Sequence, residues 1–200
     1  MNLRSTEEYP YSPPRRAGLL FQLGIIFILT GAGAMGLYRA SQASIGPVFV
    51  LWLLPALLAV GLVPILAYQL YCLRSAAYIL ERDGMRLRWG LRSEQIPMSA
   101  VLWVNRWSEL VKPLPLPVAR FPGAVVGVRQ LQGDARSAGP KLIEYMASEI
   151  GDLVLIGTQE RIFAISPSDA NSFIFDYQRL TELGSLTPLA GRSVYPSFLL

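Results

Sequence analysis

The chain has 200 residues, of which 52% are apolar and only 16% are charged, whereas about 25% of residues are charged in an average soluble domain. This composition excludes a disordered chain and an ordinary soluble globule. With no histidine, one cysteine (Cys72) and a net charge of +4, the chain cannot form an intrachain disulfide, a cysteine-rich zinc site or a catalytic pair that needs histidine.

Two stretches without a charged residue predict a pair of transmembrane helices. The first covers the 22 residues between Arg16 and Arg39, and the second covers the 34 residues between Arg39 and Arg74. About 20 apolar helical residues cross the hydrocarbon core of a bilayer, so residues 17–38 and 46–73 are each long enough to span it. We therefore expect an N-terminal segment at 1–16, a transmembrane helical hairpin at 17–73, a folded domain at 74–184 and a tail at 185–200.

Two other interpretations of these stretches stay open. A pair of buried helices in a soluble protein has a similar composition, although such helices seldom run this long without a charge. A cleaved signal peptide would explain Arg15 and Arg16 before the first stretch and the small residues Ala32-Gly33-Ala34 within it. The long leading segment with Glu7 and Glu8 argues against a signal peptide, and the second stretch would anchor the chain in either case.

Arginines are concentrated on one side of the predicted hairpin. Residues 4, 15 and 16 precede the first helix and residues 74, 82, 86, 88 and 92 follow the second, all of them arginine, while the connecting turn holds only Arg39. Positively charged residues stay on the cytoplasmic side of a membrane. We therefore expect a multi-pass protein of the cytoplasmic membrane with both termini in the cytoplasm.

The first apolar stretch contains Gly31-Ala32-Gly33-Ala34-Met35-Gly36, which matches the G-x-G-x-x-G spacing of dinucleotide-binding loops. That fingerprint requires a preceding strand and an acidic residue about 20 positions later, and the sequence predicts neither here. Small residues in a transmembrane helix instead let another helix approach closely. We therefore predict that Ala32 and Gly36 are helix-packing residues, and we expect no cofactor.

Residues 74–184 are predicted to be rich in short strands and to end in one amphipathic helix. Ser166, Pro167 and Asp169 indicate a helix start with Ser166 as N-cap, and Phe173 and Leu180 lie on an apolar stripe at helical spacing. We expect a small curved antiparallel sheet or barrel whose open end is closed by this helix. Candidate strands lie at Ala77–Glu81, Met85–Trp89, Ser99–Trp107, Ala124–Leu131, Lys141–Ala147, Leu153–Thr158 and Arg161–Ile165.

Several motifs, in this order, resemble bacterial pleckstrin-homology-like (PH-like) domains. They are Tyr78-x-Leu80-x-x-Asp83-Gly84-x-x-Leu87-x-x-x-Gly90, Arg120-x-Pro122-Gly123-x-x-x-Gly127 and Ile165-Ser166-Pro167-x-Asp169-x-x-x-Phe173. The resemblance covers residues 76–182 and includes the usual two-helix membrane anchor. It implies an α+β membrane protein with two transmembrane helices, followed by a strongly bent seven-stranded antiparallel sheet or barrel that is capped by a C-terminal helix. It implies no shared catalytic residues.

The sequence favours a non-enzymatic interaction or assembly module anchored on the cytoplasmic face of the membrane. Residues 74–200 carry 14 basic and 12 acidic residues, a net charge of +2, which is too low for a strongly basic nucleic-acid binder. We expect no catalytic residues, no metal and no nucleic acid. The expected partners are the lipid bilayer, another membrane or membrane-associated protein and a second copy of this chain.

The arginines after the second helix support an alternative function. Basic groups near an anionic leaflet gain about 1 kcal/mol each, so Arg86, Arg88 and Arg92 are candidate contacts with lipid headgroups or with a partner. The opposing interpretation is a solvated face on which acidic residues such as Glu81 and Glu94 pair with these arginines.

Two further segments have open roles. The proline-rich segment 112–122 is expected to be an edge segment or an extended loop. The apolar end of the tail, residues 190–200, is expected to pack back on the domain or to bind a partner.

Overall fold

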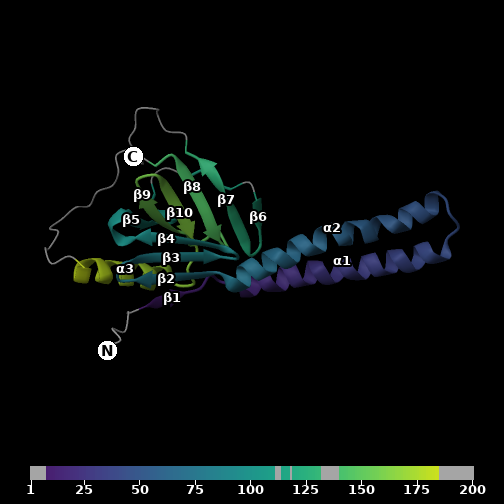
Figure 1. Ribbon diagram of the computed structural model, residues 1–200, viewed down its shortest axis with the longest axis horizontal. Coiled ribbons are helices and arrows are strands. Elements are labelled where there is room, and N and C mark those ends of the chain that lie inside the picture. The colour runs from purple at the N-terminus through teal and green to yellow at the C-terminus, as the bar shows by residue number, and fades with distance from the viewer. Residues whose placement is uncertain (1–7, 111–113, 118, 132–139, 185–200) are drawn as a thin grey trace.

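The computed structural model describes residues 8–110, 114–117, 119–131 and 140–184. Within them, a long helical hairpin projects from one end of a β-rich domain (Figure 1). The predicted tail at 185–200 lies outside the described residues.

The hairpin consists of α1 (Arg16–Gln42, 27 residues) and α2 (Pro47–Ser75, 29 residues). Both helices are long and apolar enough to cross a membrane, with mean hydropathies of 1.9 and 2.6 over their most apolar windows. Only 17% and 11% of those windows are buried in the protein, whereas a core helix of a soluble domain would be mostly buried. Large apolar side chains such as Phe27 and Val60 are therefore exposed along the hairpin.

Two glycines bring the helices together. A Cβ placed on Gly36 would lie 2.5 Å from the carbonyl oxygen of Trp52, and one placed on Gly33 would lie 2.9 Å from the Cβ of Ala59. Gly36, predicted as a packing residue, thus lies against α2. Ala32 does not, because it is exposed and precedes Gly33 by one residue, a turn of about 100° around the helix. The structure corrects the packing pair from Ala32 and Gly36 to Gly33 and Gly36.

The described domain contains two sheets. The first has the order β1-β2-β3-β4 and is antiparallel throughout, and the second has the order β5-β9-β10-β8-β7-β6. The strands of the first sheet are β1 (Tyr9–Tyr11), β2 (Ala77–Glu81), β3 (Gly84–Trp89) and β4 (Arg92–Pro97). Those of the second are β5 (Val101–Arg106), β6 (Ala119–Phe121), β7 (Ala124–Gln130), β8 (Leu142–Ala147), β9 (Val154–Thr158) and β10 (Arg161–Ile165).

This arrangement corrects the expectation of one bent antiparallel sheet or a closed barrel. A short 3-10 turn at Met98–Ala100 separates β4 from β5, and β5 then pairs with β9 rather than continuing the first sheet. Strands β8 and β10 pair in parallel, with Ile165 opposite Met146. Among the described residues β4 has no partner strand besides β3, so the two sheets stay open along this side.

Three strands were not among those predicted from the sequence: β1, β4 and β6. Each lies at the edge of its sheet. Edge strands carry exposed polar side chains and proline. In β4, for example, buried and exposed side chains alternate little, and the strand ends at Pro97. The proline-rich segment 112–122 therefore includes an edge strand, β6, in addition to residues 114–117, where Leu114 is buried.

The C-terminal helix α3 (Ala170–Gly184, 15 residues) begins later than predicted. Its N-cap is Asp169, whose Oδ1 accepts a hydrogen bond of 3.0 Å from the backbone N–H of Ser172. The predicted cap, Ser166, is buried and its hydroxyl instead accepts a bond of 2.8 Å from the N–H of Ser148. Phe173 and Leu180 are buried as expected.

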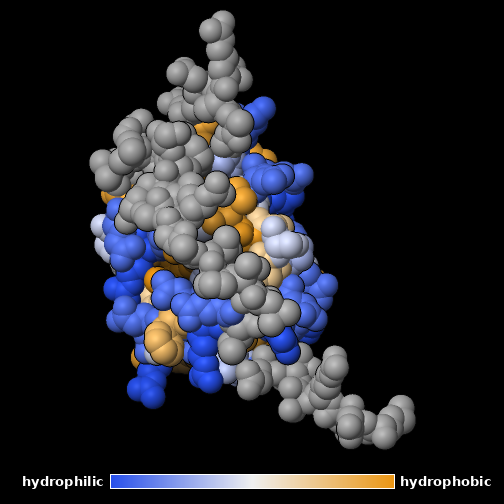
Figure 2. Space-filling view, turned by 90° about the vertical axis from the view of Figure 1, so that its left-hand side faces the viewer, coloured by the Kyte–Doolittle hydropathy of each residue, from blue (hydrophilic) through white to orange (hydrophobic). Residues whose placement is uncertain are grey.

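The second sheet is covered on both faces. Its inner face packs against the first sheet and α3 in one core that includes Leu87, Met146 and Phe173. Its outer face carries a second core with Ile143 and Tyr145, which is covered by the segment around Trp107 and Leu114. The domain end opposite the hairpin shows mainly hydrophilic side chains among the described residues, with a smaller hydrophobic area (Figure 2).

The hairpin and the domain are joined at several points. Residues before α1 form β1, which pairs with β2 directly after α2. The Arg15 guanidinium donates to the carbonyl of Ala76 at 2.5 Å. On the other side, the β6–β7 turn places Gly123 against Gly18 of α1, and Gln22 Nε2 donates to the carbonyl of Pro122 at 3.4 Å.

Candidate functional site

The open side between the two sheets is the most distinctive surface feature of the described domain. Opposed residues in neighbouring strands share a face, so Val126 lies on the same face as its partner Met146, and Val128 lies on the same face as Glu144. This is the inner face that packs against the first sheet. The first sheet ends at β4, however, and Val126 and Val128 are left exposed beyond it. We call this gap between β4, β7 and α2 the open seam.

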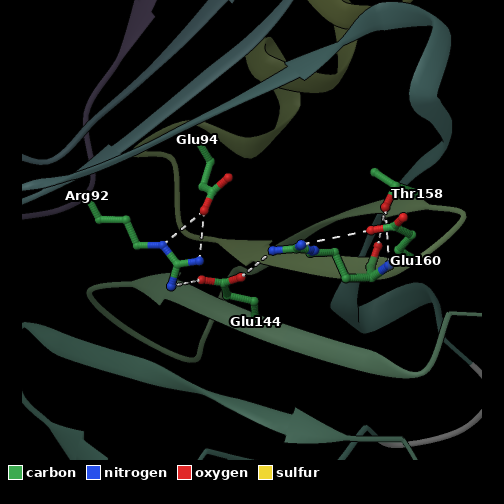
Figure 3. Close-up of polar contacts among 6 residues, drawn as sticks. Arg92, Glu94, Glu144, Thr158 and Glu160 are labelled. Carbon is green, nitrogen blue, oxygen red and sulfur yellow. Dashed lines mark hydrogen bonds and ion pairs between the residues drawn. The ribbon is translucent and has the colours of Figure 1, made fainter.

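A row of charged side chains crosses the inner end of the seam (Figure 3). Its centre is Glu144 on β8, whose side chain is only 5% exposed. One oxygen of Glu144 pairs with the guanidinium of Arg92 from β4, and the other pairs at 3.5 Å with Arg161 from β10. Buried charges are retained only when they are paired. The pair with Arg92 links the second sheet to the first, whereas the pair with Arg161 lies within the second sheet.

Neighbouring groups hold both arginines in place. Arg92 also donates to Glu94 on its own strand, from Nε at 3.1 Å and from Nη2 at 2.8 Å. The hydrogen bonds from Arg92 to Glu94 are the main cause of the raised pKa of Arg92, and the charge of Glu144 adds to it. The guanidinium of Arg161 lies over the ring of Phe163 at 5.7 Å from its centroid, and the backbone N–H of Arg161 donates to the hydroxyl of Thr158 at 3.2 Å.

Two cavities flank this charged row. The first, about 440 Å³, lies on the side away from the hairpin and is bounded mainly by polar residues of β4 and of the β9–β10 turn, including Glu94, Gln95 and Glu160. The second, about 350 Å³, lies beside the hairpin and has mostly apolar walls. It is lined by Ile65, Tyr68, Gln69 and Cys72 of α2, by Trp89 and Arg92, and by Phe121, Ala124, Val126, Gly127, Val128, Glu144, Tyr145 and Met146.

The three arginines predicted as lipid or partner contacts do not form one surface. Arg92 lies opposite Trp89 in the sheet and therefore faces inward, toward Glu144. Arg86 and Arg88 alternate with Leu87 on β3 and lie on the outer face. Arg86 pairs with Glu81 at 2.8 Å, whereas Arg88 is exposed and has no ion pair with any described residue. The set is thus divided between two faces of the first sheet.

The sequence interpretation did not single out Glu144 and Arg161 as a pair. One signal was available: Glu144 is the only charge within the otherwise apolar strand Leu142–Ala147, and a charge in a buried strand requires a partner. Its partners lie 52 residues earlier and 17 residues later in the chain, and no local pattern predicts those distances. Among the described residues, no three His, Cys, Asp or Glu side chains are grouped as metal ligands.

The architecture agrees with a match to a known family. The description "Bacterial PH domain" matches residues 76–181, which begin directly after α2 and end within α3. No curated protein and no solved structure matches the chain. Because the family match covers more than half of the 200 residues, this chain belongs to the bacterial PH domain family, and two long apolar helices that fit a membrane anchor precede its PH domain.

Proposed function

We propose that this protein is a membrane-anchored, non-enzymatic interaction module whose PH domain is held in a fixed orientation on the cytoplasmic face of the membrane. The observation that carries the proposal is the junction between hairpin and domain. Strand β1 enters the first sheet immediately before α1, and β2 enters it immediately after α2. The bonds from Arg15 to Ala76 and from Gln22 to Pro122 fasten the same end of the hairpin.

The dimensions of the hairpin support its insertion in a bilayer. At a rise of 1.5 Å per residue, the two helices are about 40 Å and 43 Å long, which exceeds the roughly 30 Å of a hydrocarbon core. Exposed aromatic residues mark two levels on α2, with Trp52 near one end and Tyr68 and Tyr71 near the other. These levels are separated by about 24–28 Å, which is the spacing of aromatic belts at the two interfaces of a membrane.

The charges support the orientation. Arg15, Arg16 and Arg74 lie at the end of the hairpin that carries the domain, and Arg39 lies near the opposite end. The excess of positive charge at the domain end supports its location in the cytoplasm. Because β1 and β2 are paired, the residues before α1 and after α2 share that side.

Anchoring gives such a module its mechanism. A domain tethered to the membrane meets membrane partners at a high effective concentration, so weak contacts are sufficient for binding. The outer edge of β4, which no described strand covers, is a suitable contact surface for a partner strand. Met98 N–H bonds to Asp83, and the alternation of an antiparallel ladder then directs the backbone of Ser93 and Gln95 away from β3. Both residues are exposed, and strand addition at such an edge is a common recognition mode.

Single-cysteine variants test the anchoring and the orientation. In a Cys72→Ala background, Ser44→Cys in the connecting turn and Ser172→Cys on α3 would be expressed in intact bacterial cells and treated with a membrane-impermeant maleimide. We expect labelling at position 44 in intact cells and at position 172 only after the cells are opened. Labelling at both positions in intact cells, or recovery of the chain in the soluble fraction without detergent, would contradict the proposal.

Photo-crosslinking tests the interaction role. A photoreactive amino acid at Gln95 should yield one defined protein adduct in membranes, and the same group at Glu182 on α3 serves as the control surface. Replacing Ser93 by proline, which removes an outward N–H, should abolish the Gln95 adduct. Equal adducts at both positions would contradict binding at the β4 edge.

Direct recognition of anionic lipid headgroups is a second candidate function, and the exposed Arg88 favours it. Arg88 is opposite Ala77, which lies two residues beyond the end of α2, so its guanidinium is near the membrane end of the domain. Anionic lipid in a nanodisc should then raise the melting temperature of the full chain, and Arg88→Glu should remove that increase. Arg82→Glu, at an exposed position in the β2–β3 turn, is the matched control.

A further inference from the structure

We infer that the apolar cavity of the open seam, between α2 and the inner face of β7, binds an acyl chain of a phospholipid from the domain-side leaflet. The inference rests on the proposed membrane insertion of the hairpin and extends it to a specific lipid contact of the PH domain. A cavity of about 350 Å³ falls in the range of small-molecule sites, which are concave and mostly apolar.

The position of the cavity relative to the hairpin identifies the occupant. Its α2 wall is formed by two turns of helix with the side chains of Ile65, Tyr68, Gln69 and Cys72. Tyr68 is one of the exposed aromatic residues at the domain end of α2. Ile65 and Tyr68 are each more than half exposed and continue the apolar surface of α2 into the cavity. An acyl chain that covers α2 can therefore enter the cavity along the apolar side chains of Ile65 and Tyr68.

The opposite wall belongs to the domain and is equally apolar. Phe121, Ala124, Val126 and Val128 lie on one face of the β6–β7 hairpin, because Phe121 is opposite Ala124 and the others alternate along β7. Phe121 and Val128 are 52% and 53% exposed. Strands β6 and β7 lie beside the domain end of α2 (Figure 1). In water these side chains would form an unprotected apolar surface, whereas at the depth of Tyr68, the domain-side boundary of the hydrocarbon core, an acyl chain that reaches into the cavity covers them.

The domain is held at that depth by contacts that reach the first turns of α1. Gly123, with φ of +87°, permits the tight β6–β7 turn to approach Gly18, and Pro122 accepts the hydrogen bond from Gln22. The β6–β7 hairpin is thus level with the start of the predicted membrane span. The Arg92–Glu144 pair lines one end of the cavity. Because the two charges of this pair neutralise each other, the remaining apolar walls favour a hydrocarbon chain as the ligand.

Photolabelling of the wild-type full-length chain tests this inference. The protein would be reconstituted in nanodiscs that contain phosphatidylcholine with a diazirine in the middle of one acyl chain, irradiated, digested and mapped by mass spectrometry. We expect adducts on lipid-facing residues of α1 and α2, such as Phe27 and Val60, and also on Val126 and Val128 of β7. The matched surface is Leu102, which is 56% exposed and belongs to β5, and it should carry no adduct. Strand β5 lies on the side of the domain away from the hairpin (Figure 1).

The outcomes separate the inference from the function on which it rests. Adducts on the hairpin without adducts on β7 would overturn the acyl-chain site and leave the membrane anchor intact. Absence of adducts from the hairpin would overturn both. Val126→Lys, which places a charge in the cavity, should eliminate labelling of Val128 while labelling of Phe27 is unchanged, and Leu102→Lys should alter neither. The wild-type map decides the question by itself if Val126→Lys does not fold.

Discussion

The charged row at the seam makes a quantitative prediction about stability. Glu144 is buried and is paired with two arginines whose side chains are 48% and 36% exposed. Two unit charges about 4 Å apart attract each other by about 4 kcal/mol at an effective dielectric constant of 20, and burial of the carboxylate costs several kcal/mol in lost hydration. One arginine offsets much of that cost, so the second arginine adds less than the first.

Removal of one arginine leaves Glu144 with the other guanidinium and should reduce the free energy of unfolding by about 1–2 kcal/mol. Removal of both leaves a buried carboxylate without a cationic partner, and the loss should rise to about 3–5 kcal/mol. We therefore expect the double variant Arg92→Ala/Arg161→Ala to lose more stability than the sum of the two single variants. Chemical denaturation of the full chain in detergent micelles, followed by tryptophan fluorescence, measures each value.

Two variants distinguish this mechanism from general damage. Adding Glu144→Met to the double variant should restore part of the lost stability, because the unpaired buried charge is then gone. Arg86→Ala breaks a pair with Glu81 at the surface and should cost about 0–1 kcal/mol. Additive losses in the double variant, or no rescue by Glu144→Met, would refute the role assigned to the charged row.

Three other predictions concern the hairpin, the N-cap of α3 and the buried Tyr78. Gly36→Leu should lower the melting temperature in detergent micelles, because a Cβ there meets the carbonyl of Trp52 at 2.5 Å, whereas Ala32→Leu, at an exposed position, should be tolerated. Hydrogen bonds from the backbone and hydroxyl of Ser172 lower the pKa of Asp169 below its ordinary value of 3.8. The charged cap of Asp169 therefore stabilises α3 fully above that value, and this contribution is lost as the pH falls through the folded-state pKa. Asp169→Ala should remove this acid dependence from thermal melts, and Asp169→Asn should destabilise the helix less than Asp169→Ala. Burial raises the pKa of Tyr78 above its ordinary value of 10.0, so stability should decline as the pH rises above about 10, and Tyr78→Phe should reduce that decline in alkaline melts; an unchanged slope would contradict it.

Much of the architecture could be predicted from local patterns. Uninterrupted apolar runs indicated both long helices because few other structures contain such runs, and alternation indicated strands such as β2, β3 and β10 because one face of each is buried. The motif order from Tyr78 to Phe173 indicated the PH family, and the family match over residues 76–181 confirms it. The membrane orientation and the absence of enzymatic activity stay predictions.

Local patterns failed where the determining contacts are distant in the chain. Strands β1, β4 and β6 are edges whose side chains carry little periodic signal. The side chains of Ser166 and Asp169 can both cap the N-terminus of a helix. Ser166 does not cap α3, because its hydroxyl is bonded to the N–H of Ser148. The candidate contacts Arg86, Arg88 and Arg92 are divided for a related reason, since the β3–β4 pairing turns Arg92 toward Glu144, and their contact with lipid or a partner stays a prediction.

Composition and periodicity thus specify the kind of elements that this chain forms, because hydrophobic burial and backbone geometry act over a few neighbouring residues. The split into two sheets, the parallel pairing of β8 with β10 and the row from Arg92 through Glu144 to Arg161 depend on strand register and on contacts between residues up to 52 positions apart. Such contacts form only when the chain folds. The open seam, where the first sheet ends before it covers β7, is likewise a feature that only the tertiary structure determines.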